Sequence, residues 1–140
     1  KIKKTKNDLK IINKMLQTDP QNLNLLFAKA SMAAIIQDVE TEIETLKKII
    51  KINPITNVKS LLAQAYLRKN DGIVNEFIKK LIDEVLFEKP KDPGANFILA
   101  KYLNQNGNKN KSRNLLLKIL KNLDDKGPWH QIYKDELNIK

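Results

Sequence analysis

Apolar residues recur every three or four positions through most of this chain, with polar residues between them. This spacing is typical of amphipathic helices, because 3.6 residues make one turn. In the first such stretch Leu9, Ile12 and Leu16 share a face, while Asp38 and Asp92 stand where N-caps are expected. The pattern predicts an all-α protein with helices over about residues 5–17, 22–37, 38–52, 56–69, 74–88, 92–106, 109–123 and 129–139.

Prolines and turn-forming residues mark the boundaries between these helices. Pro20, Pro54 and Pro90 each follow a predicted helix and lie 34 and 36 residues apart. Proline ends helices because it lacks the backbone donor and clashes with the preceding turn. Residues 70–72 and 106–108 combine Asn, Asp and Gly, which favour turns between paired helices.

A short motif repeats with nearly the same period. A bulky apolar residue, an alanine and then Lys or Gln occur as FAK from Phe27, LAQ from Leu62 and LAK from Leu99, which are 35 and 37 residues apart. Alanine lets two helix backbones approach, and its bulky neighbour fills the space beside the crossing. The two markers agree on one period, which predicts about three helix-turn-helix units. The alanines expected at equivalent contacts are Ala28, Ala63 and Ala100.

Over residues 22–123 the sequence resembles the tetratricopeptide repeat (TPR) family. The resemblance implies a TPR-like α-solenoid, in which stacked two-helix units bury the faces that no unit buries alone. Glu42 departs from the family pattern, because the second helix of a unit usually has a small residue there. We expect a single domain made of an N-terminal helix (1–20), repeat 1 (21–54), repeat 2 (55–90), repeat 3 (91–125) and a C-terminal capping helix (126–140).

Three further features narrow the resemblance. A glycine-containing insertion at residues 71–76, two prolines within residues 89–93 and the Gly-Pro-Trp sequence at 127–129 occur in this order. They resemble the soluble C-terminal repeat domain of cytochrome c maturation proteins of the CcmI/CycH type. That resemblance implies a periplasmic domain of an inner-membrane protein that holds the C-terminal helix of apocytochrome c for the subunits of a haem-ligation complex. The alternative is a generic bacterial repeat adaptor that assembles an envelope or secretion complex.

The candidate binding surface follows from the expected fold. In stacked helical pairs the first helix of each unit lines the concave side, so Lys29, Gln64 and Lys101 should form a ladder across a groove. Apolar neighbours would receive a guest helix, while basic ones would pair with its carboxylates. The same residues also fit an exposed face or core without any ligand. The predicted peptide-binding residues are Asn22, Leu25, Lys29, Met32, Asn57, Ser60, Gln64, Leu67, Arg68, Phe97, Lys101, Asn104 and Gln105.

Charge and composition add little to this interpretation. The chain has 26 basic and 16 acidic residues, a net charge of +10, which suits nucleic acid, an anionic membrane or an acidic polypeptide. The lysines occur on every predicted helix and few aromatic residues remain for base stacking, so we expect no nucleic-acid partner. No run of apolar residues is long enough to span a bilayer. Since the chain begins with Lys1, we expect a piece of a longer protein, with any membrane anchor upstream.

No residue pattern predicts catalysis or a cofactor. The chain has no cysteine, which excludes disulfides, thiolate metal sites and a thiol nucleophile. Asparagines around Gly107 lack the carboxylates of a calcium loop, and His130 is the only histidine. We therefore expect neither an enzyme nor a metal site. The residues expected on the packed side of the last helix are Trp129, Ile132, Tyr133 and Leu137.

Overall fold

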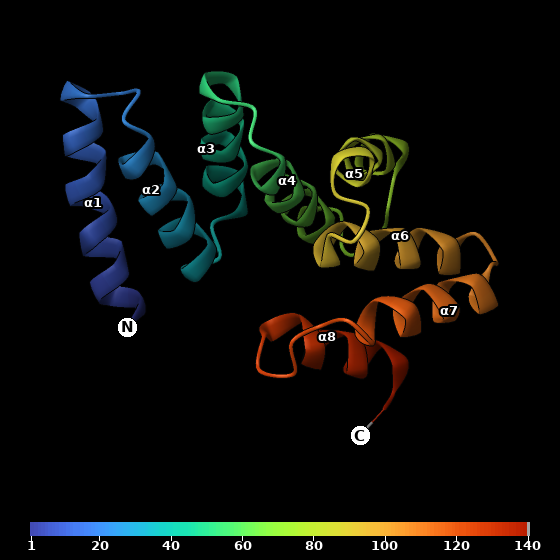
Figure 1. The fold of residues 1–140 in the computed structure, drawn as a ribbon. Helices are drawn as coiled ribbons and strands as arrows, with labels where there is room; N and C mark the ends of the chain where they lie inside the picture. The colour runs from blue at the N-terminus through green and yellow to red at the C-terminus, as the bar shows by residue number, and fades with distance from the viewer. Residues whose placement is uncertain (140) are drawn as a thin grey trace. The chain divides into compact units, whose positions relative to one another are not determined.

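The computed structural model describes residues 1–139. Residue 140, the end of the expected capping segment, lies outside the described residues. Within that range the chain forms eight helices and no strand (Figure 1), which confirms the prediction of an all-α protein. The helices are α1 (Ile2–Thr18), α2 (Leu23–Ile35), α3 (Val39–Ile52), α4 (Thr56–Lys69), α5 (Glu76–Glu88), α6 (Pro93–Gln105), α7 (Lys109–Leu120) and α8 (Pro128–Leu137).

Four of the eight helix starts in residues 1–139 follow from capping side chains in the sequence. Asn22, Asp38, Asn75 and Asp92 each accept a hydrogen bond from the backbone N–H three residues later, over 3.1, 3.2, 2.8 and 2.8 Å. Such bonds satisfy donors that the first turn leaves without an intrahelical partner. The N-cap predictions for Asp38 and Asp92 are therefore confirmed, and the cap at Asn75 explains why α5 begins at Glu76 and not at residue 74.

Helix α7 ends earlier than the periodicity predicted. The amides of Asn122 and Leu123 donate to the carbonyls of Ile119 and Leu120, three residues back, over 3.0 and 3.1 Å. These tighter bonds convert the end of the helix into turns. The apolar pattern continues through Leu123, which packs against the core from the turn, so periodicity alone placed the helix end too late.

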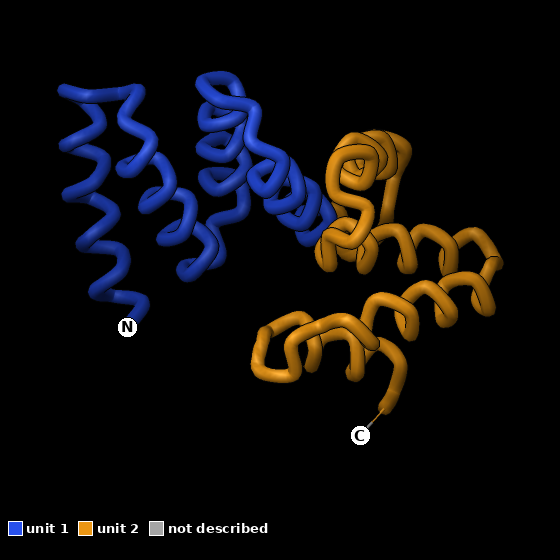
Figure 2. The backbone as a smooth tube through the Cα atoms, in the orientation of Figure 1, with its two compact units in different colours: residues 1–69 blue, residues 70–140 orange. Residues whose placement is uncertain are grey.

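The chain divides into two compact units, Lys1–Lys69 and Asn70–Lys140 (Figure 2). Each unit contains four helices, and consecutive helices pack against each other within it. In the second unit α8 contacts α6 as well as α7. Each unit is described by itself below.

Four of the helix bounds of the first unit recur in the second at one constant offset. Helix α2 spans positions 23–35 and α6 spans positions 93–105, so both ends are displaced by the same interval. The same interval separates the start of α3 at position 39 from that of α7 at 109, and the end of α1 at 18 from that of α5 at 88. It also separates Pro20 from Pro90, because each proline follows the first helix of its unit.

The helix bounds correct the expected register of the first motif. Ala63 and Ala100 are each the eighth residue of their helix, and in α2 that position belongs to Ala30. Ala30 is buried like Ala63 and Ala100, whereas Ala28 is only partly buried. The predicted equivalence of Ala28 is therefore wrong, and the equivalent alanine lies two positions later. Ala30 stands between Lys29 and Ser31 and lacks the flanking residues of the motif, which is why the motif indicated Ala28 instead.

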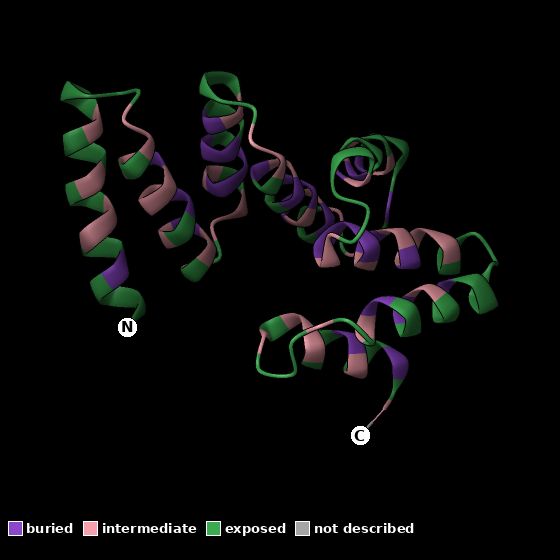
Figure 3. Cartoon of the chain, in the orientation of Figure 1, coloured by how far each residue is buried: buried purple, intermediate pink, exposed green. Residues whose placement is uncertain are grey.

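Unit 1 buries apolar side chains mainly from α2, α3 and α4 (Figure 3). Leu26, Leu46 and Ile49 come from the first pair, and Val58 and Leu62 come from α4. Helix α1 packs on α2 and leaves much of its surface exposed. The core of unit 1 thus lies along the contacts that α3 makes with α2 and with α4.

Unit 2 has a core cluster in which α8 covers α6 and α7. Tyr133 and Leu137 of α8 are buried, and Trp129 is partly buried against the same cluster. These three placements confirm the capping prediction for α8. Ile132 does not fit it, because 38% of the residue is exposed. The members of the buried cluster are Ala100, Leu116, Ile119, Tyr133 and Leu137.

Candidate functional site

The predicted binding residues lie on first helices of the expected pairs. Those up to Arg68 belong to α2 and α4 in unit 1, with Asn22 capping α2, and those from Phe97 onward belong to α6 in unit 2. The structure therefore describes two separate sets, and their use in binding a peptide stays a prediction.

In α2 the predicted residues serve local structure to different degrees. The Asn22 side chain accepts from the Leu25 amide at 3.1 Å and donates to Asp19 at 2.9 Å. Leu25 and Met32 are partly buried. Lys29 is also partly buried and lines a cleft of about 170 Å³ beside Leu16 of α1. Asn22 is thus engaged as a cap, while Lys29 faces the α1 side of its helix.

The corrected register changes the expected ladder. Lys29 occupies the helix position that Leu62 and Leu99 occupy in α4 and α6, whereas Ser31 is the counterpart of Gln64 and Lys101. Ser31 is exposed. The residue that sequence reasoning missed is therefore Ser31, and only the helix bounds indicate it.

The predicted residues of α4 are mixed in burial. Ser60 and Leu67 are buried, whereas Asn57 is exposed. The Gln64 amide donates to the Ser60 hydroxyl at 3.2 Å, one turn away. Gln64 is only partly buried, so of this group Gln64 and Asn57 present surface to a partner.

Arg68 of α4 is bound to Glu42 of α3. Its two terminal nitrogens each donate to a different carboxylate oxygen of Glu42 at 2.9 Å. The Glu42 side chain is only 7% exposed and the Arg68 side chain is 52% exposed. A bidentate pair of this kind is short and directional. Glu42 stands where the TPR family usually has a small residue, and its charge is paired with Arg68 within unit 1. A guest carboxylate would therefore have to compete with Glu42 for Arg68.

On α6, Phe97 and Lys101 face α8. The Phe97 ring lies 5.7 Å from the Trp129 ring and 5.8 Å from the Tyr133 ring, centroid to centroid. The Lys101 ammonium lies 5.0 Å from the Phe97 ring centroid and 3.3 Å from a Glu136 oxygen. A guest helix at Phe97 would therefore have to displace contacts that α8 already makes.

Gln105, the last residue of α6, forms hydrogen bonds with the turn that precedes α5. The Gln105 side chain accepts from the Val74 amide at 3.0 Å and donates to the Gly72 carbonyl at 2.7 Å. Gly72 has φ +81°, a conformation that glycine adopts without strain. Gln105 thus orders the turn that was identified as an insertion, whereas Asn104 is exposed.

These arrangements shift the pKa values of Asp38 and Tyr133. The side-chain and backbone hydrogen bonds from Thr41 hold the pKa of Asp38 below its ordinary value. Burial, with a smaller contribution from the charge of Asp92, raises the pKa of Tyr133 well above its ordinary value. Both shifts come from helix capping and packing, because Asp38 caps α3 and Tyr133 joins α8 to α6.

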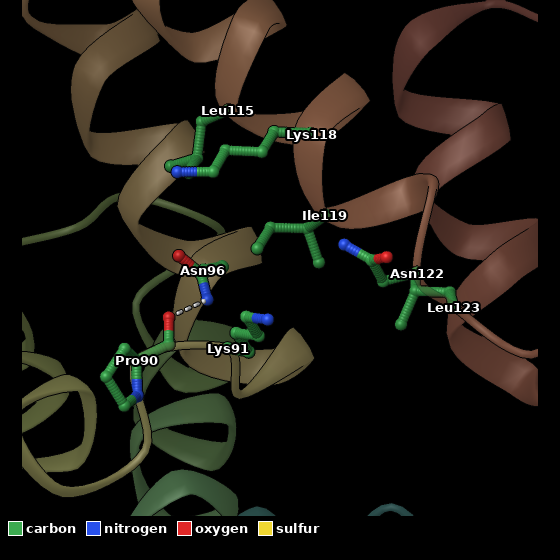
Figure 4. A pocket seen from close by; sticks show the side chains of 8 residues that line it. All are labelled: Pro90, Lys91, Asn96, Leu115, Lys118, Ile119, Asn122 and Leu123. Carbon is green, nitrogen blue, oxygen red and sulfur yellow. Dashed lines mark hydrogen bonds between the residues drawn. The ribbon is translucent and has the colours of Figure 1, made fainter.

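A cleft in unit 2 was not predicted from the sequence. It has a volume of about 270 Å³ and lies between the start of α6, with the loop before it, and the end of α7. In Figure 4 the side chains from α7 face those of the loop and of α6 across it. Its lining residues are Pro90, Lys91, Asn96, Leu115, Lys118, Ile119, Asn122 and Leu123.

Among residues 1–139 no group of three or more His, Asp or Glu side chains is placed to hold a metal ion. In the same range no helix combines the length and the apolar character that crossing a bilayer requires.

Comparison with models of known protein families finds no match, and comparison with curated proteins also finds none.

Proposed function

We propose that this chain is a TPR-like helical-repeat scaffold that holds a helical segment of another protein. The observation that supports it best is the buried alanine at the eighth position of α2, α4 and α6, together with the recurrence of both α2 bounds and the α3 start at one constant offset in α6 and α7. Repeated helix pairs of this kind present successive first helices, a geometry suited to binding an extended or helical peptide.

The chemistry of the first helices is consistent with peptide binding. Leu25 and Met32 offer partly buried apolar surface, and Gln64 and Asn57 offer amides on α4. An amphipathic helix docks its apolar face on such surface and pairs its polar side with the rim. Binding of this kind requires no catalytic group, which fits a chaperone or adaptor.

The proposed guest is the C-terminal helix of apocytochrome c, held for the subunits of a haem-ligation complex. This part of the proposal rests on the sequence resemblance through residues 71–76, 89–93 and 127–129. It places the domain in the periplasm, attached to the inner membrane by a segment outside this chain.

The test is a calorimetric titration with a synthetic peptide of the C-terminal helix of a c-type cytochrome and with a scrambled peptide of equal composition. We expect binding of the first peptide only. Because Ser31 occupies the ladder position, Ser31→Glu should weaken binding about fivefold, which corresponds to about 1 kcal/mol. Lys29→Glu is the control on the α1 side of the same helix and should change the affinity less, although it changes the net charge by two units where Ser31→Glu changes it by one.

Two results would contradict the proposal. Equal affinity for the native and scrambled peptides would show that the chain does not specifically recognise the cytochrome helix. Binding that responds to Lys29→Glu and ignores Ser31→Glu would place the contact on the α1 side of α2 and away from the proposed surface.

A further inference from the structure

We propose that the unit 2 cleft between Pro90 and Lys118 binds an acidic peptide segment, which inserts one of its own apolar side chains into the cleft. This cleft shares no lining residue with the predicted peptide-binding set discussed above. The inference rests on the burial of the residues that line the cleft, on their charge and on the recurrence of the cleft in unit 1, so it stands independently of the proposed client.

The cleft is graded from an apolar interior to a polar rim. Ile119 lies buried at its floor, and Leu115 and Leu123 are partly buried beside it. Pro90, Lys91, Lys118 and Asn122 are exposed and form the rim. The volume of about 270 Å³ is below that of pockets that enclose a drug-sized ligand, roughly 300–1,000 Å³. One bulky side chain therefore suits the space better than a whole small molecule.

The floor contains a polar group that is already satisfied. Asn96 is 3% exposed, and its side-chain nitrogen donates to the carbonyls of Pro90 and Asp92, each at 2.9 Å. These bonds fix the loop of Pro90 against the start of α6, so one wall of the cleft is held in place. A preorganised wall reduces the ordering cost of binding.

The charge of the rim selects the occupant. Lys91 and Lys118 line the cleft and no carboxylate does. The neighbouring Asp92 side chain accepts the Ala95 amide at 2.8 Å as the cap of α6. Carboxylates that flank an apolar side chain would pair with the two ammonium groups, which favours an acidic segment over a neutral one.

Unit 1 has a cleft at the corresponding place. Its lining includes Pro20, Gln21, Lys48 and Ile52, and the offset that relates the helices of the two units carries these positions onto Pro90, Lys91, Lys118 and Asn122. Lys51 adds a second ammonium group there, and no carboxylate lines this cleft either. The recurrence of proline and lysine at the same positions of the repeat shows that the arrangement belongs to the repeated fold. It is not an accident of one loop.

The lining argues against a nucleic acid as the occupant. Single-stranded nucleic acids are held by aromatic side chains on which bases stack, beside a basic track. The unit 2 cleft has no aromatic lining residue and half of its lining is Pro, Leu or Ile. An aliphatic interior with two lysines at the rim matches a leucine between glutamates.

The test is a nuclear magnetic resonance titration of the whole chain with the peptide acetyl-Glu-Glu-Leu-Leu-Glu-Glu-amide. We expect shifts centred on the amides of Leu115, Ile119 and Leu123, and on the unit 1 cleft around Ile52. The peptide with Lys in place of each Glu should produce no comparable shifts. Added salt should weaken the acidic peptide's binding, because the pairs are at an exposed rim.

A pair of charge-matched variants separates the cleft from general attraction to a basic protein. Lys91→Glu/Lys118→Glu should lower the affinity measured at Leu115 and Ile119 about tenfold. Lys80→Glu/Lys111→Glu makes the same change in net charge at exposed lysines outside the cleft, and should leave that affinity within about twofold.

Equal loss in the two variants, or shifts that avoid α7, would overturn the inference. The outcome is separable from that of the proposed function. If the cytochrome helix binds while the acidic hexapeptide does not, only the cleft is rejected. If the hexapeptide binds in the cleft and no cytochrome helix binds, only the proposed client is rejected.

Discussion

Buried polar residues in this protein form hydrogen bonds within their own unit. The Ser112 hydroxyl donates to the Ala100 carbonyl at 2.7 Å, which joins α7 to α6 at the alanine crossing. Glu42 receives both terminal nitrogens of Arg68 in unit 1. Among residues 1–139 no fully buried side-chain nitrogen or oxygen lacks a hydrogen-bond partner. Because an unpaired buried polar group is costly, these pairs constrain which helix faces can meet.

The Glu42–Arg68 pair gives the first stability prediction. Arg68→Ala should lower the free energy of unfolding by about 2 kcal/mol, since it leaves a buried carboxylate without its partner. Glu42→Gln/Arg68→Ala should recover much of that loss, because the remaining side chain is neutral. Urea denaturation followed by circular dichroism measures both effects.

The control for that experiment is the exposed pair between Lys69 and Glu40, whose charged atoms lie 3.0 Å apart. Lys69→Ala should change the free energy of unfolding by less than about 0.5 kcal/mol, because solvent screens exposed ion pairs. Equal effects of Arg68→Ala and Lys69→Ala would show that burial of Glu42 is unimportant.

At the scale of elements, α8 is joined to α6 by a hydrogen bond as well as by packed side chains. Its Tyr133 hydroxyl donates to the Pro93 carbonyl at 2.6 Å, at the first residue of α6. The Tyr133 ring also contacts Phe97 and Trp129, with centroids 5.8 and 6.2 Å away. One aromatic side chain thus anchors the end of unit 2 by packing and by a hydrogen bond.

The raised pKa of Tyr133 predicts a loss of stability at alkaline pH. The neutral phenol is favoured in the folded state, so its contribution is complete below the ordinary tyrosine pKa of about 10 and decreases as the pH rises above that value. We expect the melting temperature of the natural chain to fall between about pH 10 and 11.5 more steeply than that of Tyr133→Phe.

Tyr133→Phe removes both the titration and the hydrogen bond. At pH 7 the variant should therefore be less stable by about 1 kcal/mol, because the Pro93 carbonyl loses its donor. Tyr66→Phe is the matched tyrosine control, at a partly buried position in α4. A parallel fall for the natural chain and Tyr133→Phe would contradict the assignment to this residue.

At the scale of the whole molecule, the chain consists of two compact units, α1–α4 in the first and α5–α8 in the second. Each unit brings together apolar faces from several of its own helices. Domains of about 70 residues are near the lower limit for independent folding. The arrangement within each unit nevertheless supplies every helix with a packed neighbour.

We predict that residues 1–69 and residues 70–140 each fold when produced as separate chains. Both fragments should show helical circular dichroism and a cooperative thermal transition, since each keeps its own core. A fragment of equal length that cuts across both units, residues 38–106, should be less helical because it loses α2 and α7. Greater helicity in residues 38–106 than in the other two fragments would contradict the division.

The predictions from sequence succeeded where local chemistry decides the structure. The α4 bounds, the caps at Asp38 and Asp92 and the all-α class were predicted, because periodicity, capping side chains and prolines act within a few residues. The motif register in α2 was wrong because the motif occurs at Ala28, whereas the equivalent alanine, Ala30, has Lys29 and Ser31 beside it. Its correction needed the burial of Ala30 in the folded chain.

The candidate surface was harder to predict than the helices. Helical spacing placed Phe97, Arg68 and Gln105 on faces where a guest was expected, but it says nothing of which other helix covers those faces. In the structure they contact α8, Glu42 and the turn at Gly72. The unit 2 cleft was missed because its wall and rim come from two segments that are distant in the sequence, one around Pro90 and the other around Lys118.

The sequence by itself determined the all-α class and the approximate extent of each helix, because these properties depend on residues within one or two turns. Tertiary structure alone decided which alanine lies at the crossing, which polar side chains are committed to other helices, and where a proline and two lysines enclose a cleft. Those features arise from contacts between distant segments, and the free energy of packing chooses among the arrangements that the local pattern permits.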